Sequence, residues 1–189
     1  MGLGNPGREH AQDRHNVGFM VARELRERWS LPPAKERFRG QITEGSVGGA
    51  AAGAPGERPR RRVAVLCPLT YMNDAGRSVG PARGALRLAL EQVVVVHDEI
   101  DLPFGEVRTR IGGGLAGHNG LKSVRQALGG DGFTRVRIGV GRPDSTDPEI
   151  VAGYVLGRFS EPEAEVAALV ARACDEVEGL VLGPAGARA

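Results

Sequence analysis

The first part of the chain changes from helical to alternating hydrophobic spacing. Apolar residues within 17–29 recur three or four positions apart directly after Asn16, a residue type that favours helix starts. This spacing predicts an amphipathic helix over 17–29. Apolar and polar residues alternate over about 37–46, which predicts a strand. The Gly-, Ala- and Pro-rich stretch after it predicts a flexible hairpin loop at about 47–62.

Two unbroken apolar runs, Val63–Cys67 and Val93–Val96, have the length of strands that are buried on both faces. We therefore predict that both belong to one central sheet. Residues 76–90 between them have helical spacing, which gives a strand–helix–strand unit. The next predicted elements are a strand at 106–111, a helix at 119–128 and a strand at 134–140.

The end of the chain predicts one long helix, at about 161–180. Ser160 and Glu163 have the spacing of a capping box, and the apolar residues that follow form one helical stripe. Together the alternating elements favour the α/β class, as a three-layer α/β/α sandwich around a twisted mixed sheet. A chain of 189 residues has room for a single domain of this kind, over residues 1–189.

Composition narrows the class of protein but not its activity. Hydrophobic residues make up 41% and charged residues 25%, as in ordinary globular chains, and no apolar run is long enough to span a bilayer. The start lacks a signal-peptide pattern and there are two cysteines, so we expect a cytoplasmic protein with reduced thiols. The net charge of +2 neither requires nor excludes a polyanionic partner.

Gly2, Gly4 and Gly7 match the spacing of a dinucleotide-binding loop, but their context does not fit one. Pro6 lies inside the turn, and the next helical pattern begins well after Gly7. A nicotinamide enzyme is therefore disfavoured. The sequence also lacks the motifs of serine-nucleophile hydrolases, zinc sites and phosphate-binding loops, so we expect no cofactor and no metal.

His15 and Asp98 are the first candidates for chemistry. His15 lies in a loop before the first helix, and a neutral imidazole can accept a proton if a partner fixes its tautomer. Asp98 follows the buried run Val93–Val96, and ligands of open α/β sheets bind at the carboxyl ends of strands. Asp98 could orient a histidine or cap a turn before Pro103. The sequence leaves both interpretations open.

Two further segments add polar groups near predicted strand ends. The glycine-rich run 112–120 precedes a helix and contains His118 and Asn119, of which Asn119 would serve as an N-cap. The segment 68–73 follows a buried strand and carries Asn73. Histidine, aspartate and asparagine side chains together suit the activation of water and the stabilisation of an oxyanion without a covalent intermediate.

Six blocks of sequence, in order along nearly the whole chain, closely resemble the bacterial peptidyl-tRNA hydrolase family. They are residues 2–7, 14–18, 68–73, 97–103, 112–122 and 135–139. The resemblance implies a monomeric, metal-free esterase that acts on a nucleic-acid substrate and not at a membrane. Such an enzyme cleaves the ester between a peptide and the 3′-terminal ribose of tRNA, and so recycles peptidyl-tRNA released from stalled ribosomes.

The resemblance also implies roles for single residues. His15 matches the catalytic base of the family and Asp98 matches the residue that supports it. The implied substrate-binding residues are Asn5, Tyr71, Met72, Asn73, His118 and Asn119. The implied contacts to tRNA phosphates are Arg110, Lys122 and Arg137. Plant organellar members of this fold act in intron splicing, so a non-catalytic RNA-binding scaffold is the alternative function.

The chain departs from the family pattern at its start. His10 stands where the family often has tyrosine, and Asp13 where threonine is common. Family members usually carry several apolar residues before the block that begins at Gly2. We therefore expect most of the first strand to be missing, which would leave backbone groups of the neighbouring strands unpaired.

Overall fold

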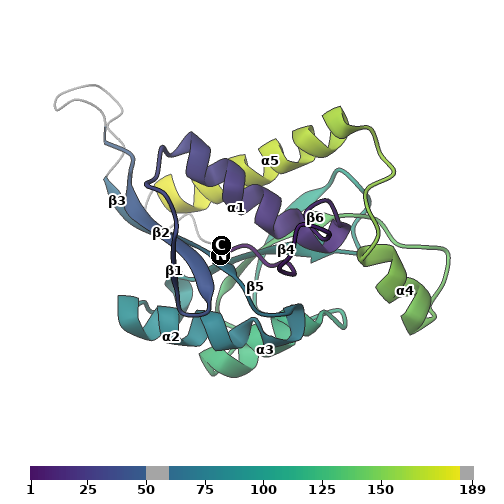
Figure 1. Ribbon diagram of the computed structural model, residues 1–189, viewed down its shortest axis with the longest axis horizontal. Coiled ribbons are helices and arrows are strands. Elements are labelled where there is room, and N and C mark those ends of the chain that lie inside the picture. Colours follow the sequence, from purple (N-terminus) through teal and green to yellow (C-terminus); the bar gives the residue numbers. More distant parts are fainter. Residues whose placement is uncertain (50–59, 184–189) are drawn as a thin grey trace.

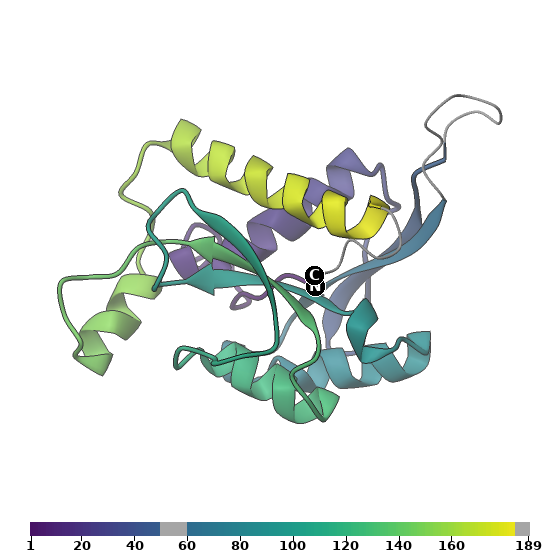
Figure 2. The same ribbon diagram turned by 180° about the vertical axis from the view of Figure 1, so that it is seen from behind.

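Three layers make up the protein, as the sequence predicts. The computed structural model describes residues 1–49 and 60–183. Helices α1 (Val17–Arg28) and α5 (Glu163–Leu182) cover one face of the strands, and α2 (Gly76–Leu86) and α3 (Asn119–Leu128) cover the other (Figure 1). The same arrangement is visible from behind (Figure 2). In the part of the chain so described, no helix combines the length and the apolar character needed to cross a membrane.

Within residues 1–49 and 60–183 the strands form two three-stranded sheets and not one. The antiparallel sheet consists of β1 (Lys35–Arg37), β2 (Gly40–Val47) and β3 (Arg61–Pro68). The mixed sheet has the order β4 (Val94–Glu99), β6 (Thr134–Gly139) and β5 (Val107–Ile111), with β4 parallel and β5 antiparallel to β6. The prediction that residues 63–67 and 93–96 share one sheet is therefore wrong in detail, since β3 and β4 belong to different sheets.

The segment Met1–Leu3 lies between these sheets and joins them. The N–H of Gly2 donates to the carbonyl of Leu66 on β3 at 3.1 Å. On the other side, the N–H of Leu3 donates to the carbonyl of Val96 at 2.9 Å, and the N–H of Val96 donates to the carbonyl of Met1 at 2.9 Å. These groups of Leu66 and Val96 are thus paired, although the sequence led us to expect unpaired groups here.

The interior consists of two apolar clusters, one on each side of the strands. Val95 belongs to the cluster under α2 and α3, together with Leu121 and Phe133. Val96 belongs to the cluster under α1 and α5, together with Val17. Successive side chains of a strand point to opposite faces, so a strand covered on both sides needs apolar residues at every position. This explains the unbroken run of valines.

Several element boundaries differ from the predictions. Helix α2 ends at Leu86 and not at 90, because Arg87 adopts a left-handed conformation with φ of 53°. Helix α5 starts without a capping box: Pro162 occupies the N-cap position, and no side chain caps the helix there. The predicted loop at 47–62 overlaps the ends of β2 and β3, and residues 50–59 of it lie outside the described part of the chain.

Helix α4 (Pro148–Val155) was not predicted. It has eight residues, none of which is buried, and the Asp147 carboxylate caps it by accepting the N–H of Glu149. The phenol of Tyr154 donates to the carbonyl of Val140 at 2.7 Å and ties the helix to the residue after β6. A helix this short and this exposed leaves little periodic signal in the sequence.

Close packing of α1 against Met1–Leu3 predicts that Gly18 cannot be replaced. A Cβ atom at Gly18 would lie 2.5 Å from the carbonyl oxygen of Leu3 and in contact with the carbonyl oxygen of Val96. We expect Gly18→Ala to lower the free energy of unfolding by about 1–3 kcal/mol, as overpacking does. Gly84→Ala is the matched control, because a Cβ there meets nothing within 4 Å. In chemical denaturation Gly84→Ala should be neutral or stabilising, and equal effects of both variants would contradict this account.

Candidate active site

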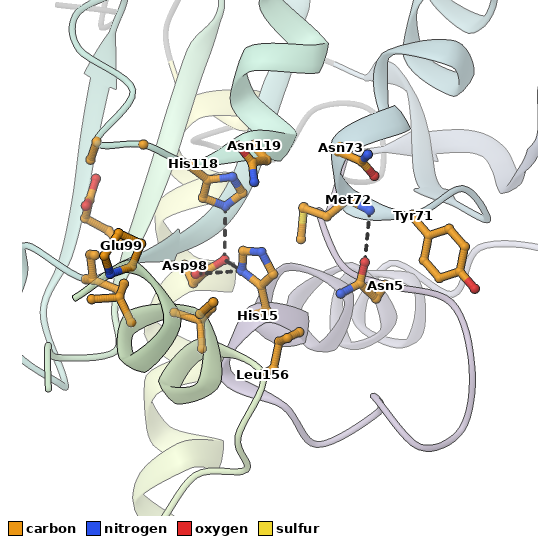
Figure 3. A pocket seen from close by; sticks show the side chains of 17 residues that line it. Asn5, His15, Tyr71, Met72, Asn73, Asp98, Glu99, His118, Asn119 and Leu156 are labelled. Atoms are coloured by element: carbon orange, nitrogen blue, oxygen red, sulfur yellow. Dashed lines mark hydrogen bonds and ion pairs between the residues drawn. The ribbon is translucent and has the colours of Figure 1, made fainter. Parts of the chain in front are cut away.

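A pocket of about 590 Å³ opens at the carboxyl end of β4. Five other segments reach it: the N-terminal segment with Asn5, the 3-10 turn Arg14–Asn16, the segment that follows β3, the start of α3, and α4. Eight of the residues singled out from the sequence line it, so segments far apart in the chain meet here (Figure 3). They are Asn5, His15, Tyr71, Met72, Asn73, Asp98, His118 and Asn119.

His15 and Asp98 form a hydrogen-bonded pair at the base of the pocket. Nδ1 of His15 lies 2.9 Å from both carboxylate oxygens of Asp98 (Figure 3). Because an ionised carboxylate only accepts, Nδ1 carries the proton and Nε2 keeps its lone pair. The side chain of His15 is 14% exposed and that of Asp98 only 3% exposed, so the imidazole is the more accessible member of the pair. Of the two interpretations of Asp98, orientation of a histidine is the one that this geometry matches.

Charge and burial shift the pKa values of His15 and Asp98 in opposite directions. Burial lowers the pKa of His15, but the charge and hydrogen bond of Asp98, with a contribution from Asp13, raise that pKa by more. Burial raises the pKa of Asp98, and the charges and hydrogen bonds of His15 and His118 bring that pKa far below its usual range. The carboxylate therefore stays ionised and holds the proton on Nδ1 of His15.

His118 is a second donor to Asp98. Its Nε2 lies 3.1 Å from Oδ1 of Asp98. Its Nδ1 accepts the backbone N–H groups of Gly120 at 3.1 Å and Leu121 at 3.3 Å, at the start of α3. His118, and not Asn119 as the sequence predicted, is thus the N-cap of this helix. Asn119 is exposed and lies at the pocket wall, where its amide accepts from Lys122 at 3.4 Å.

His97 is a buried histidine behind the pocket. Its Nδ1 lies 2.6 Å from the carbonyl oxygen of Asp98, and its ring packs edge-on against the ring of His118 at 5.1 Å. Burial, with a smaller contribution from His118, lowers the pKa of His97 to about 3. His97 is therefore neutral at physiological pH and acts as a donor to the backbone of Asp98.

Asn5 is held by hydrogen bonds of its amide oxygen and its backbone, which leave its amide nitrogen available. Its Oδ1 accepts the N–H of Met72 at 2.9 Å. The backbone of Asn5 is fixed by Asn16, which accepts its N–H at 2.8 Å and donates to its carbonyl at 2.9 Å. Asn16 makes these bonds and does not cap α1. Asn73 and the ring of Tyr71, which is 69% exposed, lie on the same side of the pocket mouth (Figure 3).

The three residues predicted to contact phosphates lie outside the pocket lining. Arg110 is exposed on β5 and Lys122 is exposed on α3. Arg137 is half-buried on β6, and its Nε donates to the carboxylate of Glu99 at 3.0 Å. Arg137 is therefore committed to an ion pair, which the sequence did not indicate.

Sequence reasoning missed two parts of the site. Arg135 is 1% exposed and donates to the carbonyls of Gly112 and Gly114, so it holds the glycine-rich loop beside the pocket. The helix α4 supplies an apolar wall. Its wall residues Val151 and Val155 are four positions apart, and this spacing was the one available signal.

His15, Asp98 and His118 also need to be considered as metal ligands. Each offers one ligand atom, and these atoms lie within 4.8 Å of one another. A metal on Nε2 of His118 would require the proton to move to Nδ1, which faces two backbone N–H donors. The hydrogen bonds of His118 therefore do not fit a metal ligand.

The fold and the pocket define a single-domain α/β protein with a carboxylate-oriented histidine in an open cleft. The model of the family "Peptidyl-tRNA hydrolase" matches residues 1–187, so the chain belongs to that family. Relatives named peptidyl-tRNA hydrolase include one from Rhodopseudomonas palustris, 43% identical over 96% of this chain and 84% of the relative. Another, from Geobacillus kaustophilus, is 44% identical over 97% of this chain and 92% of the relative.

Solved structures agree with the family assignment. A crystal structure of peptidyl-tRNA hydrolase from Acinetobacter baumannii superposes with a TM-score of 0.80 at 36% identity. The match covers 96% of this chain and 87% of that chain. The predicted family and fold class are thereby confirmed, and the chain belongs to a class of enzymes.

The pairing of His15 with Asp98 leads to a prediction about the pKa of His15. In Asp98→Asn the charge that raises this pKa is absent, while the burial that lowers it remains. We therefore expect the pKa of His15 to be lower than in the parent protein. A pH titration of the His15 ring by NMR measures it, with Lys35→Ala on β1 as the control. An unchanged or higher pKa in Asp98→Asn would contradict the pairing.

Proposed function

We propose that this chain hydrolyses the ester bond between a peptide, or an N-acylated amino acid, and the 3′-terminal ribose of tRNA. In this role it recycles peptidyl-tRNA released from stalled ribosomes. Membership of the family supports the substrate class. The observation that carries the chemistry is the His15–Asp98 pair, which leaves Nε2 of an oriented imidazole free at the pocket.

In the proposed reaction His15 acts as a general base. Its Nε2 takes a proton from water while the water oxygen attacks the ester carbonyl carbon. Asp98 stabilises the imidazolium that forms. The bond between the carbonyl carbon and the ribose 3′-oxygen then breaks, and the imidazolium returns its proton to that oxygen. The products are a peptide carboxylic acid, which releases its proton to solvent, and a tRNA with a free terminal hydroxyl, and His15 is again neutral.

Asn5 supplies selectivity for an acylated amino group. The bond of its Oδ1 to the N–H of Met72 orients the amide, so that its N–H groups remain to donate to the substrate. A peptide carbonyl accepts such a donor, whereas the ammonium of an aminoacyl ester does not. Asn73 and Asn119 both line the pocket and are placed to bind the peptide backbone, the ester or the attacking water (Figure 3).

The proposed enzyme is a monomer that works without a metal. All proposed catalytic and substrate-binding residues come from one chain and line one pocket, which supports a monomer. The hydrogen bonds of His118 support a reaction without metal. We further propose that the enzyme needs no cofactor and acts in the cytoplasm, away from membranes.

The variant His15→Ala tests whether His15 is the general base. The same assay on the parent protein distinguishes a hydrolase from an RNA-binding scaffold. We expect kcat/KM for N-acetyl-aminoacyl-tRNA to fall by about 10²–10⁴, because general-base catalysis contributes that much. Binding of the uncleaved tRNA should change little. Lys35→Ala, on the exposed strand β1, should hydrolyse at the parent rate. If the parent binds the tRNA without releasing the acyl group, the scaffold function replaces this proposal.

The salt dependence of tRNA binding tests whether Arg110 and Lys122 contact phosphates. Each neutralised phosphate contributes about one to the slope of log affinity against log salt concentration. We expect Arg110→Ala and Lys122→Ala each to reduce the slope by about one in filter binding of uncleaved tRNA. Arg137→Ala should reduce it less, because Glu99 already pairs with this guanidinium. Parent slopes in both of the first two variants would remove these residues from the interface.

A further inference from the structure

The carboxylate of Asp98 is shared by two imidazoles. His15 donates from Nδ1 to both oxygens at 2.9 Å, and His118 donates from Nε2 to Oδ1 at 3.1 Å. The two rings lie with their centroids 4.9 Å apart (Figure 3). A second donor on a carboxylate takes up part of the negative charge that would otherwise act on the first.

The proton of His118 cannot leave Nε2 for Nδ1. The backbone N–H groups of Gly120 and Leu121 both point at Nδ1, so that nitrogen must be an acceptor. The start of α3 thereby fixes the tautomer of His118. His97 packs edge-on against the same ring and limits its rotation.

We propose that His118 is a positioning residue of the hydrolytic site: its fixed N–H holds the Asp98 carboxylate in place and withdraws part of its charge from His15. This inference rests on the proposed function. It changes the role of His118 from a contact to the substrate to a group that acts through Asp98. Because Asp98 is shared with His118, Nε2 of His15 stays unprotonated over a wider pH range than it would beside Asp98 alone.

Few other titratable groups face His15. Asp13 acts on it from the preceding turn, and Asp98 and His118 are its direct neighbours. Glu99 and Tyr71 line the same pocket, but the carboxylate of Glu99 is paired with Arg137. The α4 wall brings only apolar side chains and a proline to the pocket, namely Pro148, Val151, Ala152 and Val155. Asp98 and His118 are therefore the groups whose exchange should change the titration of His15.

Two substitutions separate the two hydrogen bonds of His118. In His118→Asn, the amide oxygen can replace Nδ1 as the cap of α3, but the side chain is too short to reach Asp98. In His118→Gln, the amide nitrogen can replace Nε2 as the donor to Asp98, but the cap is lost. The first variant removes the contact to the carboxylate and keeps the helix start, and the second does the reverse.

The measurements are the apparent pKa of the acid limb of kcat/KM and the NMR titration of His15 in the free enzyme. We expect both to rise by about 0.5–1 unit in His118→Asn, because Asp98 then holds the His15 proton more tightly. The melting temperature of this variant should stay near that of the parent. In His118→Gln the acid limb should remain in place while the melting temperature falls.

Three results would overturn the inference. They are an unmoved or lowered acid limb in His118→Asn, equal shifts in both variants, and a change in KM alone without any shift in pH dependence. The last result would return His118 to substrate binding. Failure of the proposed function is separate, because it would show as a parent enzyme that does not release the acyl group, while the NMR titration of His15 needs no activity.

Discussion

The structure depends on keeping one buried carboxylate ionised. Asp98 is 3% exposed at the carboxyl end of β4, and a buried charge is costly unless donors replace the lost water. Its donors come from distant parts of the chain, His15 from 83 positions before and His118 from 20 positions after. The requirement therefore fixes where the first turn and the start of α3 must lie. The same donors form the base of the pocket, so stability and chemistry share one set of contacts.

Backbone pairing sets the rest of the pocket. The segment Met1–Leu3 is hydrogen-bonded between β3 and β4, which brings the next residues, including Asn5, to the carboxyl ends of both strands. There Asn5 joins Met72, which follows β3, to Asn16, which precedes α1. One asparagine thus connects the end of the antiparallel sheet to the start of the first helix at the site. Under the proposed function, its remaining N–H groups read the acyl group of the substrate.

Elements that follow from local periodicity could be predicted from the sequence, and features that depend on competing partners could not. Helix α3 and the strand β6 lie almost where the hydrophobic spacing predicted them. His15 and Asp98 could be predicted as site residues because they lie at the ends of a helix and a strand, and both line the pocket. Capping was harder to predict, since Asn16 and Ser160 have better partners elsewhere, in Asn5 and in Arg14. The way in which Met1–Leu3 joins the two sheets could not be predicted, because three residues are too few to show a pattern.

The two walls of the pocket differ in how firmly they are held. On the polar wall, His15, His118 and Asn5 each have a fixed donor or acceptor, as an oriented base and selective amide require. The opposite wall, α4, buries none of its side chains; the ring of Tyr154 packs under the guanidinium of Arg14, 4.2 Å away, and its phenol bonds to the chain after β6. Under the proposed function this combination is suitable, because the ester and its neighbouring amide are constant in every peptidyl-tRNA while the peptide side chains vary. An apolar wall that is held at few points can accept different peptide side chains without moving His15. Helix α4 contacts the side chain of Arg14 through Tyr154, whereas the neighbouring His15 is held separately by Asp98.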